Sequence, residues 1–176
     1  QLGALEATKS NFDVTTKYYV QALKVFDSIS DPHGQILTYM CLGNIYLAHS
    51  DSANAWKYLR LAEGVSNKAP LSDATILLNN VIGMVLAVTG RFDSAMKIFH
   101  KNLGISDKPE FLKAHLECIM YTGEVYMDNG NTKEALKYLQ NALVIAQENN
   151  LPEMEANALF DLSYLNEQTN PTLAIE

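Results

Sequence analysis

Small and apolar residues recur along this chain at a fixed interval of 40 residues. Apolar residues mostly precede the small positions, and large residues follow three positions later in the middle of the chain. Residues that end helices or form turns stand seven positions after them. The small positions, which define the interval, are Gly3, Gly43, Gly83, Gly123 and Ser163. A period of this length predicts an array of repeated helical units.

Three further columns lie in the second half of each unit. Twelve residues after the small position the residue is mostly small, sixteen after it is large, and nineteen after it is again mostly small. In the second repeat these residues are Ala55, Leu59 and Ala62. Small residues allow two antiparallel helices joined by a short turn to pack closely. We expect the Tyr46 and Leu59 columns to fill the space between one helix pair and the next. Glycine within a helix costs about 1 kcal/mol relative to alanine, so its recurrence implies a packing role.

Turn residues and prolines divide the chain into helices and repeats. The expected helices run near residues 1–9, 12–29, 34–49, 53–67, 72–89, 93–105, 109–129, 133–149 and 153–168. They form a partial repeat (1–30), full repeats (33–70, 71–108 and 109–150) and a second partial repeat (152–176). Because the chain lacks an initiator methionine and stops inside a repeat, we expect it to be a fragment of a longer protein.

These columns resemble the tetratricopeptide repeat, most clearly in Leu42-Gly43-x-x-Tyr46 followed by Ala55 and Leu59. The resemblance covers residues 1–176 and implies a single all-α domain. It further implies a right-handed superhelical solenoid of antiparallel helix pairs with about four and a half repeats. The usual unit has about 34 residues, so this 40-residue variant is more similar to the repeats of bacterial sensor and regulatory proteins. An armadillo or HEAT array is the alternative fold of similar period.

Composition narrows the function classes. The chain has 176 residues, a net charge of −7 and a pI near 5.0, with scattered Lys and Arg, which argues against nucleic acid as a partner. No apolar run approaches the roughly 20 residues that span a bilayer, so we expect no membrane insertion. Two cysteines without framework spacing favour a reducing, cytoplasmic setting.

Enzyme signatures are missing from the sequence. It contains no phosphate-binding loop, dinucleotide fingerprint, zinc-protease motif or nucleophile elbow. His115-Leu116-Glu117 matches the H-x-E of zinc deaminases, but the P-C-x-x-C partner is absent. We therefore expect a protein that is not an enzyme, with no catalytic residues, no cofactor and no metal.

The resemblance also implies a concave groove lined by the first helix of each pair. Asn44 and Asn80 would hydrogen-bond a peptide backbone. The groove is Met-rich at one end and acidic at the other, which suits an amphipathic partner segment with a basic end. For any single Met or Leu, packing between adjacent helices is the alternative. The candidate groove residues are Leu37, Met40, Asn44, Leu77, Asn80, Met84, Glu117, Met120, Glu124, Met127, Asp128 and Tyr164.

The sequence thus favours a protein–protein or protein–peptide interaction module within a larger regulatory or scaffold protein. The alternative is a peptide-gated sensory domain that controls an attached transcription regulator, histidine kinase or nucleotide cyclase. Homo-oligomers through exposed terminal repeats are a further possibility. A clamp for the C-terminal carboxylate of chaperones is disfavoured, because Met40, Val81 and Glu117 stand where Lys or Asn would be needed.

Overall fold

The computed structural model describes residues 2–169 of the chain, and side chains from residue 12 to residue 168. Within that part the chain is all-helical and contains no strand. The helices are α1 (Leu2–Ser28), α2 (Pro32–Ala48), α3 (Ser52–Ser66), α4 (Asp73–Val88), α5 (Phe92–Ser106), the 3-10 turn η1 (Pro109–Phe111), α6 (Leu112–Asp128), α7 (Thr132–Glu148) and α8 (Pro152–Thr169). No helix among these described residues has both the length and the apolar character needed to cross a bilayer.

One prediction for the N-terminal region is wrong. The expected helices at 1–9 and 12–29 are a single continuous helix, α1, so the partial repeat 1–30 contributes one helix rather than a pair. Neither Ser10 nor Asn11 forces a helix to end, because both cost well under 1 kcal/mol in a helix interior. A turn at that point would need packing between the two segments it separates. The other predicted helices are confirmed, although η1 precedes the regular part of the helix expected at 109–129.

Local sequence explains where most of the other helices begin and end. Asp31, Asp51 and Asn131 cap α2, α3 and α7, and each side chain accepts a hydrogen bond from the backbone N–H three residues on. The preceding turns pass through the left-handed region, with φ of +60° at Ser50 and +75° at Gly130. The turn column predicted at these positions is therefore confirmed.

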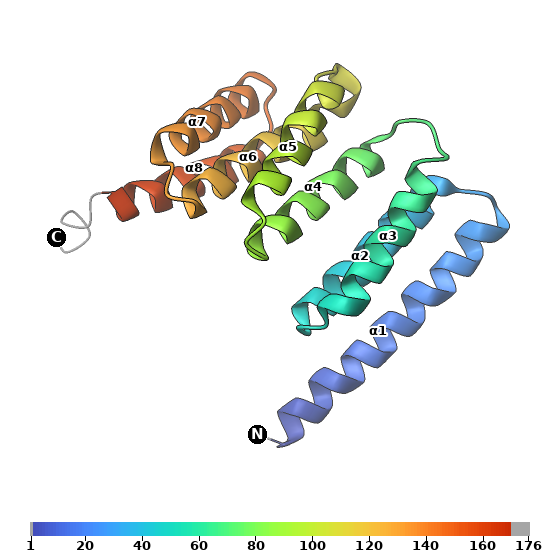
Figure 1. Ribbon diagram of the computed structural model, residues 1–176. Helices are drawn as coiled ribbons and strands as arrows, with labels where there is room; N and C mark the ends of the chain where they lie inside the picture. The colour runs from blue at the N-terminus through green and yellow to red at the C-terminus, as the bar shows by residue number, and fades with distance from the viewer. Residues whose placement is uncertain (1, 170–176) are drawn as a thin grey trace. The chain divides into compact units, whose positions relative to one another are not determined.

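The chain divides between Leu78 and Asn79 into two compact units, with the division inside α4. In unit 1, α2 packs against α1 and α3. In unit 2, α6 packs against α5, α7 and α8. Figure 1 shows α2 with α3, and α6 with α7, each folded back as a helical hairpin.

The predicted small residues lie where the helices of a hairpin cross. A Cβ on Gly43 would meet the Leu59 side chain at 3.0 Å, and one on Gly123 would meet Leu139 at 2.9 Å. Leu59 and Leu139 are fully buried. The large residue sixteen positions on therefore covers the glycine of its own hairpin, and Leu139 also belongs to a core cluster with Leu165 of the next repeat.

The tyrosine column does connect successive elements. Tyr46 of α2 meets Phe12 of α1 edge-on, with ring centroids 5.3 Å apart, and stacks on Tyr58 of α3 at 5.3 Å. The same arrangement recurs two repeats later, in unit 2. There, Tyr126 of α6 meets Phe92 of α5 and stacks on Tyr138 of α7, at 6.0 and 5.6 Å.

Candidate functional site

A cavity of about 430 Å³ lies between α6 and α8 in unit 2. The two helices contact one another directly, and α7 packs against both of them. The cavity-lining residues of α6 are Lys113, Glu117, Met120, Tyr121 and Glu124; those of the start of α8 and the turn before it are Leu151, Pro152, Glu153, Met154, Asn157, Phe160 and Asp161. We call this cavity the α6/α8 groove.

The floor of the groove is apolar. Met120 is 6% exposed and belongs to the core cluster around Leu116 and Ala158, against which Leu151 and Met154 also pack. Phe160, by contrast, is 73% exposed on α8. A large exposed aromatic beside a cavity typically supplies contact area to a bound partner.

Carboxylates dominate the polar part of the lining. Burial raises the pKa of Glu117, and the nearby charge of Glu153 raises it further. Burial also raises the pKa of Glu124 to about 7, helped by the charges of Asp161 and Asp128. The pKa of Asp161 is raised by burial as well. These groups thus lie in a half-buried site where negative charge is poorly compensated.

Tyr121 lies among these carboxylates. Burial raises the pKa of its phenol, and the charges of Glu117, Glu124 and Asp161 raise it further. The phenol therefore stays protonated and can both donate and accept a hydrogen bond. Lys113 is the one basic side chain in the lining. The arrangement attracts a cation and offers it an apolar floor.

Other chemistry-bearing side chains nearby are occupied within the fold. Cys118 is buried, and burial raises the pKa of its thiol to about 12, so the thiol is not activated as a nucleophile. His115 Nδ1 lies 2.7 Å from the Oγ of Ser106, a residue with no exposed surface. Burial lowers the pKa of His115, opposed by the charge of Asp107. Across residues 12–168, no group of His, Cys, Asp and Glu side chains is arranged to hold a metal ion.

The structure brings together Glu117, Met120 and Glu124 among the candidate residues. Asp128 is exposed beyond the end of the groove and influences it through its charge on Glu124. Met127 is 7% exposed and packs with Leu139 and Leu165 in the core, as the packing alternative for single methionines anticipated. Tyr164 is 47% exposed and does not line the cavity.

The candidates outside α6 and α8 are distributed over α2 and α4. Leu37 and Met40 are half-buried on α2, whereas Asn44 is exposed. Leu77 and Met84 are half-buried on α4. None of these residues lines the α6/α8 groove.

Asn80 is placed in the interior rather than on a groove surface. It is 1% exposed; its Nδ2 donates to the Ala114 carbonyl at 3.2 Å, and its Oδ1 accepts from Asn102 Nδ2 at 2.7 Å. Asn102 also accepts from Asn79 Nδ2 at 3.0 Å. A buried amide requires such partners, so the Asn80 side chain holds α4, α5 and α6 together and is not free to bind a peptide backbone.

Sequence reasoning missed part of the lining. Tyr121 and Asp161 stand one repeat apart, each two positions before the small residue, in a column that had not been assigned to the groove. Glu153 and Lys113, near the starts of their helices, were not assigned to the groove either. A projection of the first helix of each repeat onto one face would have placed Asp161 beside Asn157, four residues earlier.

No protein-family model matches the chain, and no curated protein matches its sequence.

Proposed function

We propose that this chain is a protein–peptide interaction module in which the α6/α8 groove binds a basic, amphipathic polypeptide segment. The proposal depends on one observation, that four carboxylates and an apolar floor line the same cavity. The carboxylates are those of Glu117, Glu124, Glu153 and Asp161. A Lys or Arg side chain would lie among the carboxylates, and an adjacent apolar side chain would pack on Met120 or Phe160.

The electrostatics favour such a partner. Burial and mutual repulsion make ionisation of Glu124 costly in the free protein, as its raised pKa indicates. A bound cation would relieve that repulsion and favour the ionised form. Charge-assisted hydrogen bonds in a half-buried site are stronger than those on an open surface. Binding of a cationic side chain and ionisation of the groove carboxylates should therefore favour one another.

The fold that we propose for this module is a tetratricopeptide-type solenoid. The support is the recurrence of the same hairpin contact, in which Gly43 lies under Leu59 and Gly123 under Leu139, together with the repeated Tyr46 and Tyr126 contacts. Identical hairpins stacked in sequence form superhelices with extended binding surfaces. We further propose that the module acts by binding rather than catalysis, as part of a larger regulatory or scaffold protein in the cytoplasm.

Binding of a defined peptide tests the proposal. The probe is a fluorescein-labelled twelve-residue helical peptide with lysines on one face and leucines on the other, measured by fluorescence anisotropy. We expect the double variant Glu124→Gln/Asp161→Asn to weaken binding by about tenfold or more, since each charge-assisted hydrogen bond contributes about 1.5–3 kcal/mol before compensation. Higher salt should weaken wild-type binding as well.

A matched control separates the groove from the general acidity of the chain. The double variant Glu110→Gln/Glu148→Gln removes two exposed carboxylates outside the groove and should leave the affinity within twofold of wild type. Phe160→Ala should weaken binding without changing the charge. Equal affinities for the groove variant and the control variant would contradict the proposal.

A further inference from the structure

Unit 1 contains a second cavity, of about 630 Å³, that none of the candidate groove residues lines. Its walls are the end of α1, the start of α2, the end of α3 and the loop that follows α3. This volume lies within the range of sites that bind small ligands or a few residues of a peptide. We call this cavity the α3-end cavity.

Gly64 keeps the α3-end cavity open. It lies within α3, where glycine is among the least favourable residues. A Cβ added at Gly64 would meet nothing within 4 Å, so the glycine is not needed for packing, unlike Gly43 in the preceding helix. Because Gly64 lines the cavity, any larger side chain there would extend into open space that a ligand could occupy.

The charges lining this cavity are mainly positive, in contrast to the α6/α8 groove. Arg60 and Lys68 both line it, with Asp27 as the one carboxylate. Asp27 Oδ1 accepts a hydrogen bond from Gln35 Nε2 at 3.4 Å. Leu61, which is 42% exposed, and Val65 add apolar surface between the two cations.

The spacing of the cations indicates the shape of the ligand. Arg60 lies four residues before Gly64 in α3, and Lys68 lies four residues after it, beyond the end of α3 at Ser66, so their backbone positions are roughly 12 Å apart. In an extended peptide, residues four apart are separated by roughly 13 Å, so two acidic side chains could each reach one cation.

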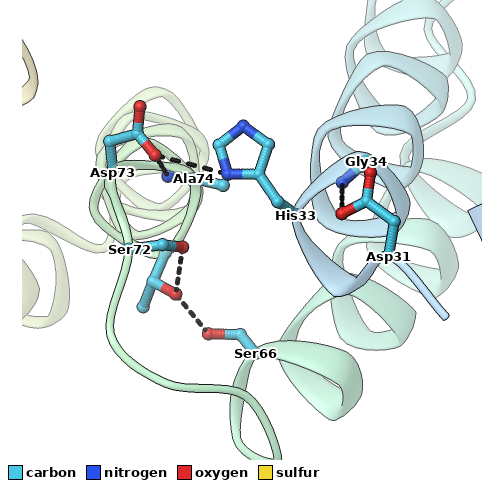
Figure 2. Close-up of polar contacts among 8 residues, drawn as sticks. Asp31, His33, Gly34, Ser66, Ser72, Asp73 and Ala74 are labelled. Carbon is cyan, nitrogen blue, oxygen red and sulfur yellow. Dashed lines mark hydrogen bonds and ion pairs between the residues drawn. The ribbon is translucent and has the colours of Figure 1, made fainter.

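Hydrogen bonds fix the walls of the cavity. Ser66 Oγ donates to Thr75 Oγ1 at 3.1 Å, and Ser72 Oγ lies 3.4 Å from the same oxygen, so the loop from 67 to 72 is tied to α4. Figure 2 shows these contacts beside the Asp31 cap of α2 and the 3.3 Å contact between His33 Nδ1 and Asp73 Oδ1. Walls that are already ordered reduce the entropy lost on binding.

We infer that the α3-end cavity is a second binding site, which takes an acidic polypeptide segment in extended conformation, with carboxylates at Arg60 and Lys68 and apolar side chains against Leu61 and Val65. This site does not depend on the α6/α8 groove, because it lies in the other unit and has the opposite charge preference.

The probe is a labelled eight-residue peptide with glutamates at its second and sixth positions and leucines between them. We expect saturable binding by wild type that weakens as salt rises, and at least tenfold weaker binding of the same peptide with glutamines. Gly64→Trp should weaken binding at least tenfold by filling the cavity. Arg60→Glu/Lys68→Glu should do so by repelling the peptide.

The chain provides matched controls for both variants. Gly104 lies one repeat after Gly64, at the equivalent place near the end of α5. A Cβ added at Gly104 would also meet nothing within 4 Å, but Gly104 does not line the cavity. Gly104→Trp and the double variant Lys57→Glu/Lys97→Glu, which changes the net charge equally outside the cavity lining, should therefore bind the peptide as wild type does. Absence of saturable binding by folded wild type, or equal loss in Gly64→Trp and Gly104→Trp, overturns the inference.

Discussion

The two units share a packing scheme but differ in their charge. Residues two repeats apart occupy equivalent places: Gly43 and Gly123 lie under leucines, and Tyr46 and Tyr126 each contact two other aromatic rings. At equivalent positions of α2 and α6, however, Asn44 of unit 1 is matched by Glu124 of unit 2. Residues 1–78 carry a net charge of −1 and residues 79–176 one of −6. The interior columns thus keep the same contacts in both units, whereas more exposed columns differ in charge.

The starts of α2 and α4 in unit 1 illustrate the same difference. His33 and Asp73 lie in contact across these helix starts, with Nδ1 and Oδ1 3.3 Å apart (Figure 2). Their equivalents in unit 2 are Lys113 and Glu153, which line the α6/α8 groove. One pair of positions therefore links two helices in unit 1 and borders a cavity in unit 2.

The largest expected effect tests whether the two packing schemes are equivalent. Gly43→Leu and Gly123→Leu should each lower the free energy of unfolding by about 3 kcal/mol, because the new side chain would overlap Leu59 or Leu139 at the hairpin crossing. Urea denaturation followed by circular dichroism measures the loss. A loss confined to one unit would show that the hairpins are not equivalent.

A smaller effect concerns the pH dependence of stability, to which Glu124 contributes in unit 2. Glu124 has a pKa of about 7 in the folded protein against an ordinary value of 4.5. The folded state therefore binds the proton more tightly, and stability falls as pH rises from 4.5 to 7. Relative to Glu124→Gln, wild type should lose roughly 2 kcal/mol of unfolding free energy across that window, after allowance for solvent screening.

The equivalent change in unit 1 is the control for this titration. Asn44 is exposed, so Asn44→Glu places a carboxylate in water and should leave the pH dependence of stability as in wild type. His115 opposes the trend at low pH, since its lowered pKa makes protonation unfavourable in the folded state, but this contribution is common to all three proteins. A steep new pH dependence in Asn44→Glu would contradict the comparison.

A third prediction concerns the aromatic contacts. Tyr46→Leu and Tyr126→Leu should each cost about 1.5 kcal/mol, because leucine retains apolar burial but loses the edge-on and stacked ring pairs. Leu86 occupies this column in the intervening repeat, which indicates that leucine fits the position. Thermal unfolding would reveal the two losses, and a much larger one at either site would mean that the tyrosine has another role.

The smallest effect concerns the N-caps of α3 and α7. Asn131→Ala should cost about 1 kcal/mol or less, because one hydrogen bond from the Glu134 backbone N–H is lost. Asp51→Ala should lower the melting temperature more, since Asp51 accepts from both the backbone and the side chain of Asn54. The reverse order in calorimetry would contradict this ranking.

Much of the local structure could be predicted from the sequence. Gly43, Gly83 and Gly123 marked the hairpin crossings because only a missing side chain admits the facing large residue. Gly90 and Gly130 marked the ends of α4 and α6 because glycine allows the left-handed backbone of the turn that follows each helix. The continuous α1 was not predicted, because whether Ser10 turns or remains helical depends on packing rather than on its own preference.

The groove was only partly predictable. Glu117, Met120 and Glu124 followed from their position on the first helix of a repeat, but Asp161 comes from the next repeat. Its proximity depends on how α8 packs beside α6. Asn80 has the polar side chain of a groove residue, yet it is buried and paired with Asn102.

By itself, the sequence determined the period, most of the helices and the small residues at their crossings, since these depend on backbone preference and side-chain size within a single repeat. Only the tertiary structure decided which polar side chains are exposed to water and which contact one another. Burial raises the pKa of Glu124 and fixes the amide of Asn80, and burial is a property of neighbours that are distant in sequence.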